Sequence, residues 1–140
     1  MAQSIREVMT PDPTTVQARD SVVDAARVMR DEHVGAAIVL EEGQVAGILT
    51  DRDIAVRAVA EGRDPEKTTV GEICSRDIVA LAPDQTVEEA IEVVRDRDVR
   101  RVPVVDEDGQ QVGIVSLGDL AIERDPDSAL AEISAAPPNR

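Results

Sequence analysis

The sequence predicts a mixed α/β (α+β) fold in which one β-α-β-β-α repeat occurs twice. The main observation is self-similarity. Shifting residues 7–55 by 65 positions, with one extra residue near Asp108, aligns them with the second half, and sixteen of the 49 positions match. Each half also carries an apolar pattern with helical spacing, followed by two short apolar runs around a glycine-containing turn.

Each repeat contains one amphipathic helix that a hydroxyl residue opens. Residues 22–32 follow Ser21, residues 87–97 follow Thr86, and the apolar residues in both recur at helical spacing. Serine and threonine favour the N-cap because their side-chain oxygen accepts a hydrogen bond from a free backbone amide. Thr86 with Glu89 also matches a capping box. We therefore expect a helix with one buried face in each repeat.

The strands are predicted from short apolar runs. The first strand of each repeat is expected at residues 14–16 and 77–81. Two hairpin strands follow each helix, in "AAIVL-EEGQ-VAGIL" and "VPVV-DEDGQQ-VGIV", with Gly43 and Gly109 where the turn needs a positive φ. A last helix is expected in "DRDIAVRAVAE" and in "LGDLAIERD".

The predicted organisation is a first repeat at residues 7–65, a polar connector at 62–69, and a second repeat at 73–125. Residues 126–140 are expected to form a mobile C-terminal tail. A three-stranded sheet in about 50 residues is thin for independent stability. We therefore expect the two sheets to pack together, with approximate twofold symmetry, in one compact domain.

The chain is acidic and has no aromatic residue, with a formal net charge of −14. Such a surface repels a phosphate backbone and offers no ring for base stacking, which argues against nucleic acid as a partner. The single cysteine, Cys74, excludes an internal disulfide and is typical of a reducing compartment. No apolar run approaches the roughly 18 residues of a membrane span, so we expect a cytoplasmic protein without a membrane partner.

One motif occurs at the same place in both repeats, as "GILTDRDIA" and "GIVSLGDLA". Gly47 allows close backbone approach, Thr50 ends the strand, and Asp53 lies in the first helical turn. A hydroxyl, free helical amides and a carboxylate match a ribose with a phosphate attached. The pairs Thr50–Asp53 and Ser116–Asp119 also have the spacing of ordinary capping boxes. Both interpretations remain open on the motif alone.

The tandem pattern G-h-h-[TS]-x-x-D after an apolar strand resembles the cystathionine-β-synthase (CBS) domain pair, or Bateman module. The stretches "VGAAIVLEEGQVAGILTDRDI" and "VRRVPVVDEDGQQVGIVSLGDL" carry the resemblance, which extends over roughly residues 7–125. It is closest to small stand-alone two-repeat proteins of bacteria, including actinobacterial stress and hypoxic-response proteins. The resemblance implies a disc-like, usually dimeric, non-catalytic pair. It also implies that AMP, ADP, ATP or S-adenosylmethionine binds in clefts between the repeats.

The resemblance also implies roles for individual residues. Asp53 and Asp119 would bind ribose hydroxyls, and Thr50 and Ser116 would lie near a phosphate. The edge of the base would meet Thr14 and Thr15 in one repeat and Ile78 and Val79 in the other, and the cleft walls would be Ala36, Ala37, Ile38, Arg101, Val102 and Pro103.

The two expected clefts differ. Arg52 in the first repeat aligns with Gly118 in the second, so we favour the first cleft for a charged nucleotide. The basic run "RDRDVRR" offers Arg100 and Arg101, which would either contact a polyphosphate or belong to a solvated helix end paired with neighbouring aspartates.

Three functions remain in order of preference. The first is a non-catalytic sensor for an adenosyl ligand that signals in trans, to an unidentified protein effector, or through a homodimer formed by faces such as "IAVRAVA". The alternative is a ligand-free structural or protein-interaction module with the same fold. An enzyme comes third, because no nucleophile elbow or P-loop is present.

No cofactor is required by this interpretation, although an adenine nucleotide or S-adenosylmethionine would be the bound ligand. No metal site is predicted either. His33, the only histidine, is expected at the surface or as a helix cap, and Cys74 is expected as a small buried hydrophobe.

Overall fold

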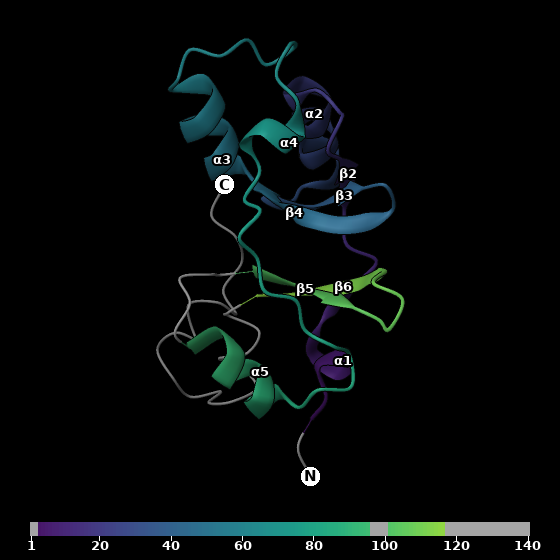
Figure 1. The fold of residues 1–140 in the computed structure, drawn as a ribbon. Helices are drawn as coiled ribbons and strands as arrows, with labels where there is room; N and C mark the ends of the chain where they lie inside the picture. The colour runs from purple at the N-terminus through teal and green to yellow at the C-terminus, as the bar shows by residue number, and fades with distance from the viewer. Residues whose placement is uncertain (1–2, 96–100, 117–140) are drawn as a thin grey trace. The chain divides into compact units, whose positions relative to one another are not determined.

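The computed structural model describes residues 3–95 and 101–116, and the chain divides into two compact units (Figure 1). The first unit is Pro13–Ile78, and the second unit combines Met1–Asp12 with Val79–Arg140. Each unit holds one three-stranded sheet with helices, which confirms the predicted mixed α/β class. The expected packing of the two sheets against each other stays a prediction.

The first unit has a sheet of strand order β2-β3-β4, in which β2 runs parallel to β3 and β4 runs antiparallel to it. The β3–β4 turn places Glu42 at φ +54° and Gly43 at φ +80°, as the turn prediction required. The elements of this unit are β2 (Thr15–Gln17), α2 (Val22–Glu32), β3 (Ala36–Glu41), β4 (Gln44–Thr50), α3 (Asp51–Asp53), η1 (Ile54–Val59) and α4 (Val70–Ile73).

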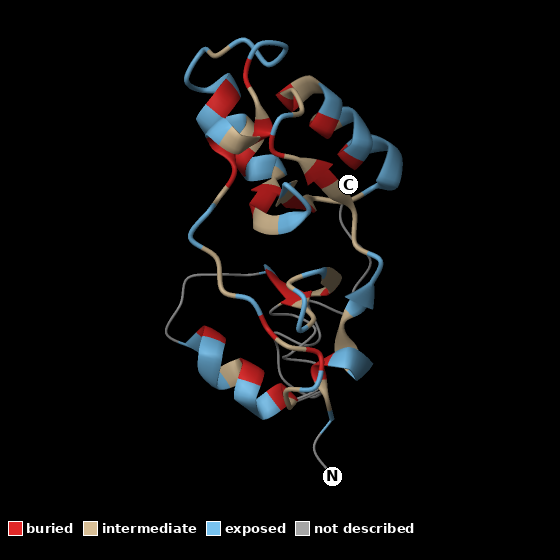
Figure 2. Ribbon diagram, turned by 45° about the vertical axis from the view of Figure 1, so that its right-hand side comes forward, coloured by how far each residue is buried: buried red, intermediate tan, exposed pale blue. Residues whose placement is uncertain are grey.

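Helix α2 forms as predicted. The Ser21 Oγ accepts a hydrogen bond from the Asp24 amide at 3.0 Å, which caps the first turn. His33 ends the helix in the left-handed conformation and is exposed, so the expected surface or cap role is confirmed. Buried and exposed residues alternate around the helix (Figure 2), and its buried side packs with Ala37, Val39 and Leu49 of the sheet.

The helix after Thr50 also forms, but it changes character after one turn. From Ile54 to Val59 it is a π-helix, closed by a hydrogen bond from the Ala60 amide to the Ala55 carbonyl at 2.8 Å. Helices of this kind are rare and are often associated with functional sites. Ala58 on this element is fully buried in the core of the first unit.

The second unit has the strand order β1-β6-β5, with antiparallel pairing throughout. Its buried core includes Ile5, Leu81, Ala90 and Val104. The elements in the described ranges are α1 (Ile5–Val8), β1 (Thr10–Pro11), α5 (Val87–Arg95), β5 (Arg101–Val105) and β6 (Gln111–Ser116).

The strand predicted at residues 77–81 does not form. Only Leu81 pairs with Val104, in an isolated parallel bridge, through two hydrogen bonds of 3.0 and 2.9 Å. Proline explains the loss. Pro103 has no amide hydrogen to donate on one side of the bridge, and Pro83 has none on the other. The third strand of this sheet is β1, which the sequence pattern did not reveal.

The segment before each repeat packs on the other repeat's unit. Helix α1 and strand β1 precede the first unit in sequence but belong to the second, where Thr10 pairs with Ile114. Residues 69–76, which we call the arm, play the same part in the first unit, where Ser75 pairs with Ile48. Both segments have a capping box, at Ser4 and Thr69. The spatial units therefore differ from the sequence intervals 7–65 and 73–125.

The last predicted helix, in residues 117–125, and the tail at 126–140 lie outside the described residues. Across residues 3–95 and 101–116, none of the helices combines the length and apolar character that a membrane span requires.

Candidate functional site

The predicted site residues of the first repeat meet at one end of the first sheet. Ala36 at the start of β3 pairs with Thr50 at the end of β4, and Ile38 pairs with Thr15 on β2. The Ile38 amide donates to the Thr14 carbonyl at 2.9 Å. Parallel and antiparallel pairing therefore bring together strand ends that are far apart in sequence. Ala37, also predicted here, points into the core of the unit.

Asp53 is the central group of this site, and it is buried, with only 7% of the residue exposed. Its Oδ2 accepts a hydrogen bond from the Thr50 amide at 2.9 Å, and its own amide donates to Thr50 Oγ1 at 3.0 Å. This reciprocal pair is a complete capping box. The capping role that the sequence allowed is therefore real, and any ligand role must coexist with it.

The other oxygen of Asp53 has longer contacts. Ser75 Oγ donates to Oδ1 at 3.4 Å, and Arg57 Nε forms an ion pair with Oδ1 at 3.8 Å. Neither residue is among those that the repeated motif predicts. Arg57 could have been found, because it lies four residues after Asp53 on a helix. Ser75 could not, because no local signal links it to a residue 22 positions earlier.

The expectation of free helical amides for a phosphate is wrong for the first repeat. The Asp51 amide donates to the Gly35 carbonyl at 3.0 Å, and the Arg52 amide donates to Asp51 Oδ1 at 2.8 Å. The Asp53 amide is already bonded to Thr50. Arg52, within this helix start, has an exposed side chain.

The second unit brings together fewer of the predicted residues. Arg101 pairs with Ser116 at the ends of β5 and β6, and Val102 and Pro103 are buried beside them. Asp119 and Arg100 lie outside the described residues.

Ile78 and Val79 mark the boundary between the units. Ile78 is the last residue of the first unit and Val79 begins the chain's return to the second. Both are half-buried.

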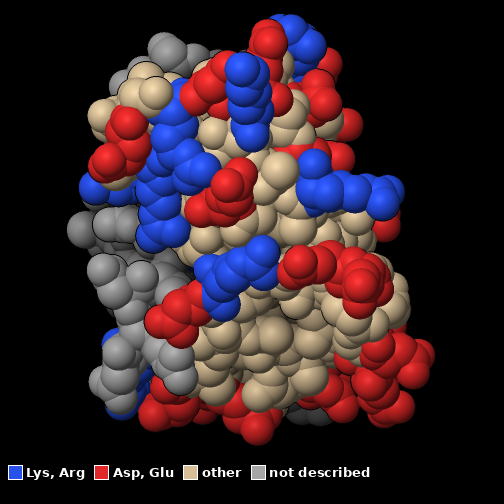
Figure 3. Space-filling view, turned by 45° about the horizontal axis from the view of Figure 1, so that its top comes forward, with Lys and Arg blue, Asp and Glu red and all other residues tan. Residues whose placement is uncertain are grey.

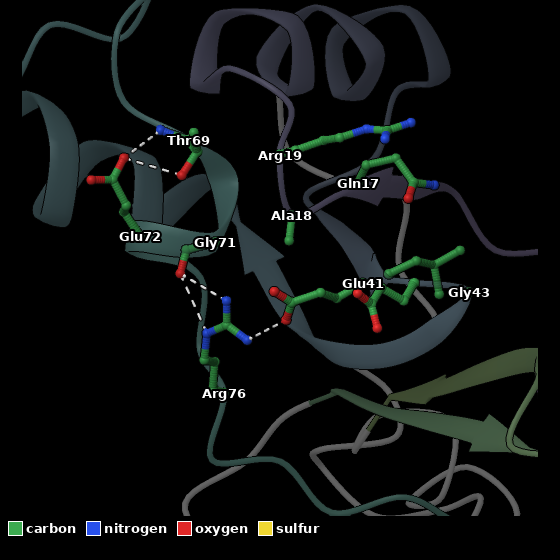
Figure 4. Close-up of a pocket in the computed structure, with 11 residues that line it drawn as sticks. Gln17, Ala18, Arg19, Glu41, Gly43, Thr69, Gly71, Glu72 and Arg76 are labelled. Atoms are coloured by element: carbon green, nitrogen blue, oxygen red, sulfur yellow. Dashed lines mark hydrogen bonds and ion pairs between the residues drawn. The ribbon is translucent and has the colours of Figure 1, made fainter.

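A surface hollow of about 750 Å³ lies at the opposite, turn end of the first sheet (Figure 4). Arg76 of the arm crosses it, with its guanidinium 3.0 Å from Glu41 and 3.3 Å from the Gly71 carbonyl. Arg19 lines the same hollow and is exposed. The hollow is therefore polar and of mixed charge.

A similar hollow of about 690 Å³ occurs at the turn end of the second sheet. It is lined by Arg6 and by four carboxylates, which are Asp84, Asp106, Glu107 and Asp108. The repeated fold has thus produced two hollows with different charge. On the face that Figure 3 shows, acidic and basic side chains are interspersed.

Cys74 is buried in the core of the first unit, as expected. Burial raises the pKa of its thiol, which disfavours the reactive thiolate. Within the part of the chain that the structure describes, no group of three or more His, Cys, Asp or Glu residues is placed to hold a metal ion.

Comparisons with known proteins agree with the repeat. The family model of the CBS domain matches residues 5–59 and, a second time, residues 70–124. The chain is 40% identical over 135 residues to CBS domain-containing protein YhcV of Bacillus subtilis (strain 168), covering 94% of this chain and 95% of that protein.

Two solved structures are also similar. The first is Hypoxic Response Protein I with two coordinated zinc ions, with a TM-score of 0.75 and 33% identity over 85% of this chain and 97% of that one. The second is the CBS domain pair of protein MJ0100 in complex with 5′-methylthioadenosine and S-adenosyl-L-methionine. Its TM-score is 0.78, with 25% identity over 91% of this chain and all of that one (100%). Because one family model matches both halves, the chain belongs to the CBS domain family.

Proposed function

We propose that this protein is a non-catalytic sensor that binds an adenosine-type ligand through Asp53 and the residues around it. The ligand class is AMP, ADP, ATP or S-adenosylmethionine, and the repeated Thr50–Asp53 and Ser116–Asp119 motifs each supply a carboxylate for ribose hydroxyls. In the first repeat, Arg52 would meet a phosphate or carboxylate of the ligand.

One observation carries the proposal. The first sheet gathers Thr14, Thr15, Ala36, Thr50 and Asp53 at a single end, although they come from three strands and a helix start. The similar CBS pair of protein MJ0100, which holds two adenosyl compounds, supports the ligand class. A carboxylate has about four lone-pair positions, so the capping contact leaves Asp53 able to accept further hydrogen bonds.

The first experiment is a thermal-shift panel with AMP, ADP, ATP, NAD and S-adenosylmethionine, read by circular dichroism because the chain has no aromatic residue. A ligand at 100 times its Kd adds about 2.7 kcal/mol of stability, which corresponds to roughly 5–15 °C for a chain of this size. A shift of that order with one adenosyl compound supports the sensor. An unchanged Tm with every ligand at millimolar concentration favours the ligand-free interaction module.

Calorimetric titration of Asp53→Ala then separates ribose binding from capping. Glu89→Ala is the matched control, because the Thr86 amide donates to Glu89 Oε1 at 3.0 Å in a reciprocal capping box with the same spacing. We expect both substitutions to lower the Tm and only Asp53→Ala to weaken ligand binding, by at least tenfold. Equal affinity in Asp53→Ala and the unmodified protein would reduce Asp53 to a cap.

The output of such a sensor would pass through self-association or a protein effector. The π-helix exposes Val56 and Val59, at 45% and 66%. This supports a homodimer, because exposed apolar helix faces favour burial against a second copy. Sedimentation velocity with and without the ligand tests it, and Val59→Glu is expected to leave a monomer in both conditions.

A further inference from the structure

The Asp53 carboxylate is enclosed, and the groups that enclose it come from the arm and from η1. The Asp53 side chain is only 10% exposed, so a ligand cannot reach its oxygens unless a neighbouring group moves. Oδ2 is held by the Thr50 amide at 2.9 Å, within the helix start itself. Oδ1 is covered by Ser75 and Arg57, whose contacts of 3.4 and 3.8 Å are longer and weaker.

Arg57 connects the same carboxylate to the end of helix α4. Its Nη1 donates to the carbonyl oxygens of Ile73 and Cys74 at 3.2 and 3.3 Å, while its Nε faces Asp53. A cation at these carbonyls stabilises a helix C-terminus. The Arg57 side chain is 53% exposed, so it can leave this position without disrupting a core.

We propose that Ser75 and Arg57 form a latch on Asp53, and that the bound ligand opens it. The proposal rests on the function proposed above and describes how the site is regulated. A ribose hydroxyl forms a hydrogen bond of about 2.7 Å with a carboxylate, so it outcompetes contacts as long as those of the latch. Binding at Oδ1 displaces the Ser75 hydroxyl and releases Arg57 from the end of α4.

Opening the latch loosens the arm. The Ser75 amide and carbonyl exchange hydrogen bonds with Ile48 at 2.9 and 3.0 Å, and without the side-chain latch these two bonds open more often. The next residue, Arg76, crosses the hollow at the turn end of the sheet and pairs with Glu41. Ligand binding at one end of the sheet is thereby transmitted to a charged surface at the other.

The latch belongs to the first repeat. At the position that matches Arg57, the second repeat has Glu123, and Thr10 matches Ser75. A glutamate cannot pair with a carboxylate as Arg57 does. The two sites therefore differ in regulation as well as in the Arg52–Gly118 exchange.

Hydrogen–deuterium exchange of the arm, with and without AMP or S-adenosylmethionine, tests the latch. The variants Ser75→Ala and Arg57→Gln open the latch. Thr10→Ala is the matched control for Ser75→Ala, because Thr10 lies in the second unit. Arg27→Gln is the matched control for Arg57→Gln, because Arg27 is exposed on α2. In the unmodified protein, we expect the ligand to accelerate exchange at Cys74–Arg76. In Ser75→Ala, exchange should already be fast without ligand.

Calorimetric affinity is the second readout. Ser75→Ala should bind the ligand about three- to tenfold more tightly, since the hydroxyl no longer competes. A residue with only a structural role would lower the Tm without tightening binding. Ligand binding with unchanged arm exchange, or weaker binding by Ser75→Ala, overturns the latch and leaves the sensor intact. No binding by the unmodified protein overturns the sensor and the latch together.

Discussion

The two units use the same sequence pattern but differ in one strand. In the first unit, hydrogen bonds to β3 extend past both ends of β2. The Ile38 amide donates to the Thr14 carbonyl at 2.9 Å, and the Ala18 amide donates to the Leu40 carbonyl at 2.8 Å. In the second, Pro103 and Pro83 occupy the matching positions and donate no hydrogen bond. A strand in one unit becomes a single bridge in the other. The presence or absence of backbone amide donors, rather than the apolar pattern, decides whether this segment forms a strand.

The other edge of each sheet is more alike. A Cβ on Gly47 would collide with the Ser75 carbonyl, and a Cβ on Gly113 would collide with the Met9 Sδ. Gly47 therefore makes room for the arm in the first unit, and Gly113 makes room for Met9 and β1 in the second. The nearest obstacle is rigid backbone in the first unit and the Met9 side chain in the second, where the Thr10 carbonyl lies next, at 3.0 Å.

The largest expected effect comes from exchanging the proline pattern between the units. Ile38→Pro removes the hydrogen bond to Thr14 from a fully buried position and should cost about 3 kcal/mol of unfolding free energy. The reverse change, Pro103→Ile, should stay within about 1 kcal/mol, because the gained bond offsets the lost rigidity of proline. Urea unfolding followed by circular dichroism measures both. Equal losses would mean that the prolines do not cause the difference.

The next effect sharpens the comparison of the two glycines. Gly47→Ala should destabilise by about 2–3 kcal/mol, since the Ser75 carbonyl cannot move without breaking the pairing of the arm. Gly113→Ala should cost less, about 1–2 kcal/mol, because the Met9 side chain can turn aside and the Thr10 carbonyl, 3.0 Å from the added Cβ, needs to give only slightly. Thermal unfolding of the two variants side by side gives the order. The reverse order would contradict the assignment of rigid and flexible obstacles.

The smallest effect concerns two exposed caps, one in each unit. Hydrogen bonds from the Thr69 amide and hydroxyl lower the pKa of Glu72, and those of Thr86 lower the pKa of Glu89. A lowered folded pKa adds stability that is present above the ordinary glutamate pKa and is lost as the pH falls through the lowered value.

The measurement is the Tm from about pH 6 to about pH 3, where these glutamates become protonated. Glu72→Gln and Glu89→Gln should each reduce the fall in Tm between these two pH values. The effect of Glu72→Gln should be the larger, since Arg63 also pairs with Glu72 at 2.9 Å. If the Tm of both variants falls with pH as steeply as that of the unmodified protein, other carboxylates determine the acid sensitivity.

The sequence alone determined the repeated elements and their local ends. The helices after Ser21 and Thr86, the Gly43 turn and the Thr50–Asp53 capping box all depend on residues within a few positions of one another. Such signals do not require knowledge of the rest of the chain.

Only the tertiary structure decided which distant segment completes each sheet and closes the site. Strand β1 pairs with β6 at one edge of the second sheet, whereas Leu81 makes a single bridge to β5 at the opposite edge, where two prolines remove the donors. Ser75 reaches Asp53 because the arm crosses Gly47. These contacts depend on which backbone groups and side chains meet in space, and no local periodicity encodes that meeting.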